Sequence, residues 1–211
     1  MSSAPYASQL SGIKILLHVG CGSSRSAKVP SLFRSEGWKE VRLDADPASD
    51  SDIVASMTSM PAVQSSSIAA IFSSHSLNKL YPHEVPVALK EFHRVLTPNG
   101  FVLLKLPDLQ RAAELIIDGK LEDTAYLSSD GPVAPLDILY GHRLPLARGE
   151  LFKAHRTGFT ATTLAKTLLA AGFAQVAVRR DGSYGLCAIA CRQPLPEEQI
   201  TNLQKALSAI D

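Results

Sequence analysis

The clearest hydrophobic pattern in the chain is an apolar run that ends abruptly in glycine. Residues 13–19 read Ile-Lys-Ile-Leu-Leu-His-Val, and Gly-Cys-Gly-Ser-Ser follows at 20–24. A run of this length that is apolar at most positions is typical of a strand covered on both faces of a sheet. Glycine lets the chain turn sharply and approach a ligand closely because it has no Cβ. The pattern therefore predicts a buried strand whose carboxyl end meets a ligand.

Strand and helix patterns alternate through the rest of the chain. Short apolar runs predict strands, and apolar positions three or four residues apart predict helices, although Pro30 would shorten or break a helix near 25–36. Alternation of this kind indicates an α/β fold with a mostly parallel sheet between helices, and a turn signal at 180–183 predicts an antiparallel hairpin at the end. The predicted strands are 38–44, 52–55, 67–75, 101–106, 173–180 and 184–192, and the predicted helices are 82–96, 108–119, 160–172 and 196–210.

The segment from Lys120 to Gly158 breaks this regularity. Prolines, glycines and mixed polarity replace any period there, and such a long stretch without regular structure is usually a functional lid or a disordered excursion. Its aromatic residues favour a lid. We expect one domain over 1–211, with a flexible leader at 1–12 and a lid-like insertion at 120–158. We expect an amphipathic helix at 196–210 that docks on this domain or on a second copy, which would make a homodimer.

The composition indicates a cytoplasmic protein without a strongly charged partner. Lysine and arginine number 21 and aspartate and glutamate 20 among 211 residues, so nothing in the charge favours a nucleic acid. The three cysteines, Cys21, Cys187 and Cys191, lack metal-binding spacing and indicate reduced thiols, so no metal is expected. No stretch is long and apolar enough to span a membrane.

Candidate ligand-binding residues follow three of the predicted strands. They are the glycine turn at 20–24, Asp44, and Ser74 with His75, and in open α/β sheets ligands bind outside such carboxyl ends. Asp44 lies 24 residues after the first glycine, close to the offset at which an acid binds a ribose, with Asp46 as the alternative. A dinucleotide loop requires a third glycine where this chain has Arg25. The pattern thus favours a nucleoside over NAD or FAD.

Several segments in order resemble the motifs of one family, the class I S-adenosylmethionine-dependent methyltransferases, and in particular their type 11 group. Residues 17–22 (Leu-His-Val-Gly-Cys-Gly) look like the first motif, 37–44 like the second and 71–77 like the fourth. Residues 95–101 and 106–109 are similar to the segments around the fifth strand. The resemblance covers nearly the whole chain. It implies a Rossmann-like three-layer sandwich, a seven-stranded sheet with an antiparallel last strand, and S-adenosylmethionine as cofactor.

The resemblance also implies roles for individual residues. The glycine turn would pass under the methionine part of the cofactor, Asp44 would accept the ribose hydroxyls, and Ser56 and Met57 would edge the adenine. Ser74 and His75 would lie beside the sulfonium and its methyl group. The residues expected to bind the cofactor are Gly20, Cys21, Gly22, Ser23, Asp44, Ala45, Ser56, Met57, Ser74 and His75.

The chain departs from the family pattern at three places. His18 stands where an acid usually begins the first motif, Ser24 takes the third glycine position, and Asn78-Lys79 replaces a common Glu-His pair. These departures keep a second hypothesis open, a methyltransferase-like module that binds cofactor or a partner without catalysis.

Histidines are the candidate catalytic residues, because imidazole can accept a proton near neutral pH. His75 follows a strand, and His142 and His155 lie in the insertion. A general base is needed only where the acceptor loses a proton during attack. We expect methyl transfer to an unidentified acceptor, which we take to be a small molecule.

Overall fold

A computed structural model describes residues 12–22, 29–128, 130–182 and 184–208, with the backbone alone for 206–208. Its elements follow the alternation expected from the sequence. In chain order they are β1 (Lys14–Val19), η1 (Ser31–Arg34), β2 (Trp38–Asp44), β3 (Ile53–Val54), β4 (Ile68–Ser74), η2 (Leu77–Lys79), α1 (Val85–Val95), β5 (Leu96–Pro107), α2 (Leu109–Ile117), β6 (Tyr126–Ser128), β7 (Gly131–Val133), α3 (Pro135–Tyr140), α4 (Arg143–Ala147), η3 (Leu151–Lys153), α5 (Ala161–Ala170), β8 (Gln175–Arg180), β9 (Gly185–Cys191) and α6 (Glu197–Ser208).

One seven-stranded sheet organises the fold, in the order β3-β2-β1-β4-β5-β9-β8. Strands β1 to β5 pair in parallel, whereas β9 is antiparallel to both β5 and β8. The expected mostly parallel sheet with an antiparallel last strand is therefore confirmed. The strand order reverses at β1, which pairs with β2 on one side and β4 on the other. Ligands of open α/β sheets bind at such a reversal.

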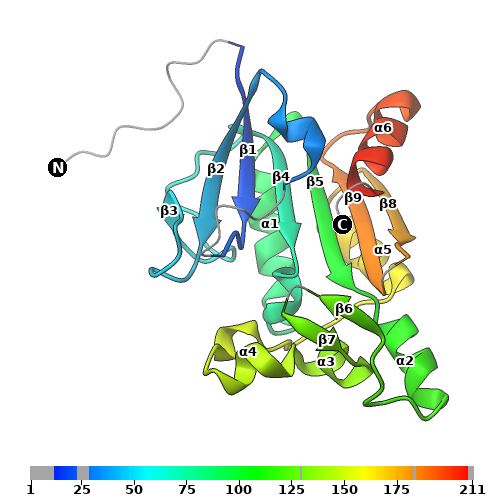
Figure 1. Cartoon of the computed structure of the whole chain (residues 1–211). Coiled ribbons are helices and arrows are strands. Elements are labelled where there is room, and N and C mark those ends of the chain that lie inside the picture. The colour runs from blue at the N-terminus through cyan, green and yellow to red at the C-terminus, as the bar shows by residue number, and fades with distance from the viewer. Residues whose placement is uncertain (1–11, 23–28, 129, 183, 209–211) are drawn as a thin grey trace.

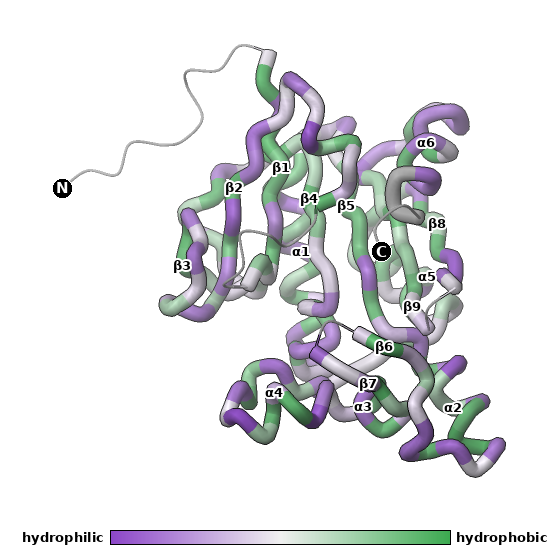
Figure 2. The backbone as a smooth tube through the Cα atoms, in the orientation of Figure 1, coloured by the Kyte–Doolittle hydropathy of each residue, from purple (hydrophilic) through white to green (hydrophobic). Residues whose placement is uncertain are grey.

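Helices cover both faces of the sheet, so the protein is the expected three-layer sandwich (Figure 1). Leu17 and Val19 of β1 face the layer formed by α1 and α5, where Phe92 and Leu168 are fully buried. Leu16 lies in the opposite core, which η1 and α6 cover. Because both faces are buried, the central strands are apolar at nearly every position, and hydrophobic residues predominate along β9 in Figure 2.

Short regular elements occupy much of the 120–158 insertion, where we expected none. They are the hairpin of β6 and β7, the helices α3 and α4, and the turn η3. Elements of three to six residues are too short to show a hydrophobic period, which is why the sequence pattern missed them. Ala112 of α2 packs with Val133 and Ile138 in a small core of their own. In Figure 1 these elements lie beyond the carboxyl ends of β1, β4 and β5.

The C-terminal helix docks on its own domain. Leu203 of α6 is buried in the core that also holds Phe101 and Cys191, and Ile200 packs against it. The leader expected at 1–12 lies almost entirely outside the described residues, as does the end of the predicted helix at 209–210. Among the residues that the structure describes, no helix has the length and apolarity needed to cross a membrane.

Candidate functional site

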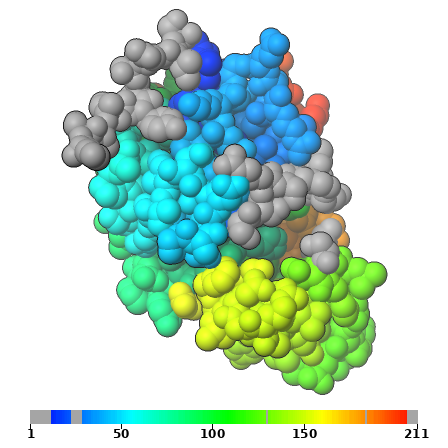
Figure 3. Space-filling model, turned by 60° about the vertical axis from the view of Figure 1, so that its left-hand side comes forward, coloured from blue at the N-terminus to red at the C-terminus, as the bar shows by residue number. Residues whose placement is uncertain are grey.

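A cavity of about 680 Å³ opens at the carboxyl ends of β1, β2 and β4, and we call it the strand-end cavity. It brings together three segments that the sequence analysis singled out separately: the glycine turn, Asp44, and Ser56 with Met57. The insertion closes its other side, and Figure 3 shows the insertion against the segment that follows β2. Its lining residues are Gly20, Cys21, Gly22, Leu43, Asp44, Ala45, Asp46, Ala55, Ser56, Met57, Ser76, Lys79, Leu80, Glu150, Phe152, Lys153 and Arg156.

The glycine turn is held against the end of β4 by a close contact. Gly20 has φ +69°, a conformation that favours glycine, and a Cβ added there would overlap the Ser76 hydroxyl. That hydroxyl donates to the Gly20 carbonyl oxygen at 3.2 Å. Gly22 also has a positive φ, +65°, but open space surrounds the position of its missing Cβ. Packing therefore requires glycine at position 20, and backbone conformation alone favours it at 22.

Buried Arg42 fixes the turn from the side of β2. Its Nη2 donates to the carbonyl oxygens of Cys21 and Gly22 at 3.4 and 3.0 Å, and its Nε donates to the Asp50 carbonyl oxygen at 3.0 Å. Its Nη1 lies 3.5 Å from Glu40 Oε1. Arg42 is thus a positioning residue for the glycine turn.

His18 is buried and does not line the strand-end cavity. Its Nδ1 lies 2.8 Å from Glu40 Oε1, and its ring packs beside Phe72. The hydrogen bond from His18, followed by the charge of Arg42, lowers the pKa of the Glu40 carboxyl. The position that usually carries an acid in the first motif therefore holds here a buried side chain that is hydrogen-bonded to Glu40.

Asp44 lines the strand-end cavity, and both of its carboxylate oxygens are bonded to backbone N–H groups. Its Oδ2 accepts from the Gly22 N–H at 2.8 Å, and its Oδ1 accepts from the Asp46 N–H at 3.0 Å. Each carboxylate oxygen can accept a further hydrogen bond. The carboxylate is thus rigidly placed and retains acceptor capacity toward the cavity.

The insertion is fastened to η2 through Arg156. The Arg156 N–H donates to the Asn78 carbonyl oxygen at 2.9 Å, its Nη1 donates to the Lys79 carbonyl oxygen at 3.1 Å, and its guanidinium lies 5.0 Å from the centre of the Tyr81 ring. Lys79 lines the cavity floor, where burial lowers its pKa and the nearby charge of Asp44 opposes that effect. These contacts make residues 150–156 a wall of the cavity.

His75 faces a second cavity of about 300 Å³, which we call the tyrosine cavity. Its backbone has φ +50°, and its N–H donates to the Lys105 carbonyl oxygen at 2.8 Å. His75 is exposed to solvent, although protein atoms crowd around its side chain. Burial, and then the nearby positive charges of His155 and Lys105, lower its pKa to about 4. The tyrosine cavity is lined by His75, Lys105, Leu106, Pro107, Tyr126, Leu127, Asp181, Tyr184 and Gly185.

The other predicted residues lie apart from the strand-end cavity. Ser74 and His75 precede Ser76, which lines it in their place. His155 is partly buried, and its Nδ1 lies 3.0 Å from the Ile138 carbonyl oxygen. His142 lies beside the Pro132 carbonyl oxygen at 3.0 Å and lines neither cavity. Ser23 lies outside the described residues.

Cys21 carries no nucleophilic or metal-binding character in this site. Burial raises the pKa of its thiol to about 11, so the thiol stays protonated at neutral pH. Across the described ranges, no group of three or more histidine, cysteine or acidic side chains could hold a metal ion.

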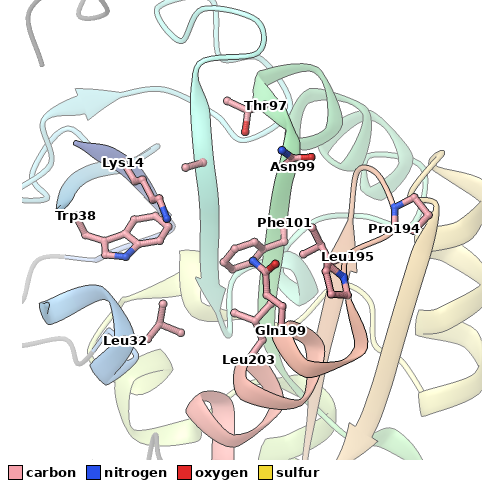
Figure 4. A pocket seen from close by; sticks show the side chains of 12 residues that line it. Lys14, Leu32, Trp38, Thr97, Asn99, Phe101, Pro194, Leu195, Gln199 and Leu203 are labelled. Carbon is pink, nitrogen blue, oxygen red and sulfur yellow. The ribbon is translucent and has the colours of Figure 1, made fainter. Parts of the chain in front are cut away.

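A third cavity, of about 730 Å³, lies at the opposite ends of the strands (Figure 4). Lys14 and Trp38, the first residues of β1 and β2, line it together with Leu203 of α6. Although it is slightly larger, it sits at the amino ends of the strands, where open α/β sheets do not bind ligands. We therefore take the strand-end cavity as the candidate functional site.

Asn78 is a buried amide without a partner. Only 1% of its surface is exposed, and neither Oδ1 nor Nδ2 bonds to any described residue. It stands next to Lys79 and under Arg156, between η2 and the insertion. Buried polar groups are almost always hydrogen-bonded, so an unsatisfied amide beside Lys79, which lines the cavity, is a feature that a buried water can explain.

The sequence analysis missed the residues that come from the insertion and from η2, and it missed Arg42. Phe152, Lys153 and Arg156 lie more than a hundred residues from the glycine turn. Their one sequence signal was the presence of aromatic and charged residues in a segment without period. Lys79 was noted only as a departure from the family pattern.

We predict that alanine at position 20 is much more harmful than alanine at position 22. Gly22→Ala should lower the free energy of unfolding by about 1–2 kcal/mol, the cost of holding an alanine in the left-handed backbone conformation. Gly20→Ala should cost about 2–5 kcal/mol because overlap with Ser76 is added. Urea unfolding of both variants measures this difference, and equal losses would contradict the close contact.

We expect Asn78→Leu to raise the stability of the ligand-free protein. Removing a buried, unsatisfied amide recovers its desolvation cost, about 1–3 kcal/mol. Chemical denaturation measures the change, and Leu77→Asn, which buries a new amide on the same turn, should do the opposite. A loss of stability in Asn78→Leu would show that the amide has a partner.

His75 should make the protein less stable as the pH falls. Its pKa is lowered in the folded state, so between its ordinary value of 6.5 and about 4 the unfolded chain binds a proton that the folded chain does not. The free energy of unfolding should therefore decrease through this window as acid is added, and less so in His75→Asn, which tolerates the left-handed backbone. Exposed His83→Asn is the control, and identical pH profiles for all three proteins would exclude the effect.

Comparisons with known proteins agree with this geometry. A family model described as "Methyltransferase domain" matches residues 17–104, which span β1 to most of β5. No curated protein matches the chain by sequence.

Solved structures with a similar fold include a CMeT domain and two proteins that are named as methyltransferases. The CMeT domain of the citrinin polyketide synthase has a TM-score of 0.57 at 18% identity, covering 87% of this chain and 47% of that one. A second structure is the 1,6-didemethyltoxoflavin-N1-methyltransferase of Burkholderia thailandensis, solved with 1,6-didemethyltoxoflavin and S-adenosylhomocysteine. Its TM-score is 0.54 at 16% identity, covering 86% of this chain and 72% of that one. A SAM-dependent methyltransferase of Methanosarcina mazei has a TM-score of 0.56 at 18% identity, covering 88% of this chain and 95% of that one.

The chain thus spans about half of the polyketide synthase structure that it matches and nearly all of the M. mazei protein. Identities below one fifth show a common fold. Residues 17–104 carry the methyltransferase domain match, and the chain shares the fold of these methyltransferase structures.

Proposed function

We propose that the protein transfers a methyl group from S-adenosylmethionine to a small-molecule acceptor. The observation that carries the proposal is the strand-end cavity, where the glycine turn, Asp44 and the Ser56-Met57 pair meet at the reversal of strand order. The methyltransferase domain match covers these same strands. The acceptor's identity, and the binding of this nucleoside in this cavity, are parts of the proposal.

The residues of the strand-end cavity fit the chemistry of the cofactor. Asp44 is a fixed carboxylate with acceptor capacity for two ribose hydroxyls. The positive φ of Gly20 and Gly22 leaves backbone exposed without Cβ atoms on the cavity side of the turn. Leu43, Ala55 and Met57 supply an apolar edge of the kind that an adenine requires.

When bound, S-adenosylmethionine supplies a methyl group on a positively charged sulfur. Most of what the protein contributes is positioning and exclusion of water, because a methyl group moves readily to a nucleophile held in line. Arg42 and Ser76 hold the turn, and Arg156 holds the insertion over the cavity. His75 is kept uncharged by its lowered pKa, so it adds no positive charge that would repel a sulfonium.

A weak base at His75 restricts the acceptors that the protein can use. With a pKa of about 4, its imidazole is a poor acceptor for the proton of an ordinary alcohol. We therefore propose that His75 positions the acceptor, and that the acceptor is one that ionises easily or needs no base. His142 has no place in this proposal, because it lines neither cavity.

A small-molecule acceptor is supported by the size of the cavities and by one structural neighbour. The B. thailandensis enzyme named above holds a small molecule, 1,6-didemethyltoxoflavin, in its structure. The nearly balanced charge of this chain favours no polyanionic acceptor.

A second candidate is a module that binds the nucleoside without catalysis. The burial of His18 favours it, because the acid that usually begins the first motif is absent from the cavity lining. Calorimetric titration with S-adenosylhomocysteine, followed by assays for its release from S-adenosylmethionine with acceptors, separates the two. Absence of nucleoside binding would reject both candidates, and binding with turnover would reject the second.

We predict that Asp44→Ala weakens binding of S-adenosylhomocysteine by about 1–3 kcal/mol, the loss expected for hydrogen bonds to a charged group. Asp46→Ala is the matched control, since Asp46 lines the same cavity and is the alternative ribose acid. Titration calorimetry measures both affinities. Unfolding curves show how much each variant is destabilised by the loss of its side chain's hydrogen bonds to the backbone. A larger loss in Asp46→Ala would transfer the ribose role to Asp46.

A further inference from the structure

The tyrosine cavity lies on the other side of His75 from the strand-end cavity. Ser76 lines the first cavity and His75 the second, so the bend that follows β4 separates them. Leu106 and Pro107 at the end of β5 form its floor, and Tyr126 of the insertion and Tyr184 of the β8–β9 hairpin form its walls. The two cavities thus lie next to consecutive residues, His75 and Ser76.

Two nearly parallel aromatic rings stand in this cavity. The rings of Tyr126 and Tyr184 lie 5.9 Å apart between centroids, with 16° between their planes. The Arg111 guanidinium lies 5.6 Å from the centre of the Tyr184 ring. Arg111 and Tyr126 thus hold Tyr184 in place. Parallel rings offer a flat surface on which another flat ring can stack.

The backbone is strained at two residues of the same cavity. His75 has φ +50° and Tyr184 has φ +62°, and Ser66 is the one other non-glycine residue with a positive φ in the described part of the chain. Bulky residues rarely adopt this conformation, and such strain gathers at binding sites. Here it directs two ring-bearing residues, from β4 and from the hairpin, to one cavity.

Charged and polar groups complete the lining. Lys105 lines the cavity and its positive charge reaches His75. Asp181 accepts from the Gly185 N–H at 2.7 Å, which fixes its carboxylate at the rim. Burial, and then the negative charge of Asp181, raise the pKa of Tyr126, so its phenol remains a hydrogen-bond donor. The Lys105 ammonium and the Tyr126 phenol can both donate a hydrogen bond to an oxygen of the ligand, and Asp181 balances the charge of the lining.

We infer that the tyrosine cavity binds the methyl acceptor, and that this acceptor is a flat aromatic molecule of one or two rings that carries an ionisable hydroxyl. This inference rests on the proposed function. A volume of about 300 Å³ is at the lower limit of small-molecule pockets, which fits one or two fused rings. Stacking on Tyr126 orients the ring, and Lys105 stabilises the ionised oxygen.

Transfer of the methyl group from S-adenosylmethionine to the hydroxyl oxygen of the acceptor accounts for every bond formed and broken. The hydroxyl loses its proton to solvent as it ionises beside Lys105. An oxygen lone pair then forms a bond to the methyl carbon, and the carbon–sulfur bond breaks with its electron pair passing to sulfur. The products are an aryl methyl ether and S-adenosylhomocysteine. This route needs no strong general base, in agreement with the weakly basic His75.

The test measures binding of naphthol to the full chain saturated with S-adenosylhomocysteine, by ligand-observed NMR and calorimetry. Decalol, which has the same skeleton without aromatic rings, and naphthyl methyl ether, which has no ionisable hydroxyl, are the comparison probes. Naphthol should bind about tenfold more tightly than either, a difference of about 1.4 kcal/mol. With S-adenosylmethionine, naphthyl methyl ether should form.

Variants assign this binding to the tyrosine cavity. Tyr126→Leu and Lys105→Met should each weaken naphthol binding about tenfold, whereas Tyr126→Phe should retain the ring contact. Tyr140→Leu, in the same insertion and 63% exposed, is the matched control and should leave binding unchanged. All four should bind S-adenosylhomocysteine as the natural protein does, which also reports that they fold.

Equal affinity for naphthol and decalol, or unchanged naphthol binding in Tyr126→Leu and Lys105→Met, overturns the inference while S-adenosylhomocysteine still binds. Failure of the natural protein to bind S-adenosylhomocysteine overturns the proposed function, and the inference with it.

Discussion

The close packing of Gly20 against Ser76 is the constraint on which the site depends. These residues follow β1 and β4, the two neighbouring strands at which the chain order reverses. Because glycine has no side chain at position 20, the two strand ends can approach so closely that Ser76 Oγ donates a hydrogen bond to the Gly20 carbonyl oxygen. The strand-end cavity begins at this contact, and His75, one residue earlier, is turned by its positive φ toward the other cavity.

Buried charges stiffen the site more than they line it. The Arg42 guanidinium donates to the carbonyl oxygens of the glycine turn and lies beside Glu40. His18 makes a second contact with the same carboxylate. Taking such groups out of water is costly unless their donors and acceptors are paired, as they are here. The polar network therefore fixes the loop geometry, and the carboxylate of Asp44 lines the cavity beside it.

One insertion contributes to both cavities. Residues 150–156 form a wall of the strand-end cavity, and Tyr126 with Leu127 form a wall of the tyrosine cavity. Ile138 shares a small core with Tyr126, and its carbonyl oxygen lies 3.0 Å from His155 Nδ1, which joins these two parts. Arg156 fastens residues 150–156 to η2. A methyl donor and its acceptor would thus be enclosed by a single structural unit, which suits a reaction in which water must be excluded.

The sequence by itself determined the sheet and half of the site. The apolar run of β1, the alternation of strands with helices and the final hairpin were readable because period and turn chemistry are local properties, and so was the spacing that pairs Asp44 with the glycine turn. Only the tertiary structure decided that His18 is a buried partner of Glu40, that Ser76 rather than His75 meets Gly20, and that Tyr126 and Tyr184 share a cavity. Those contacts join residues far apart in the chain, and their geometry follows from side-chain packing, which no periodic pattern records.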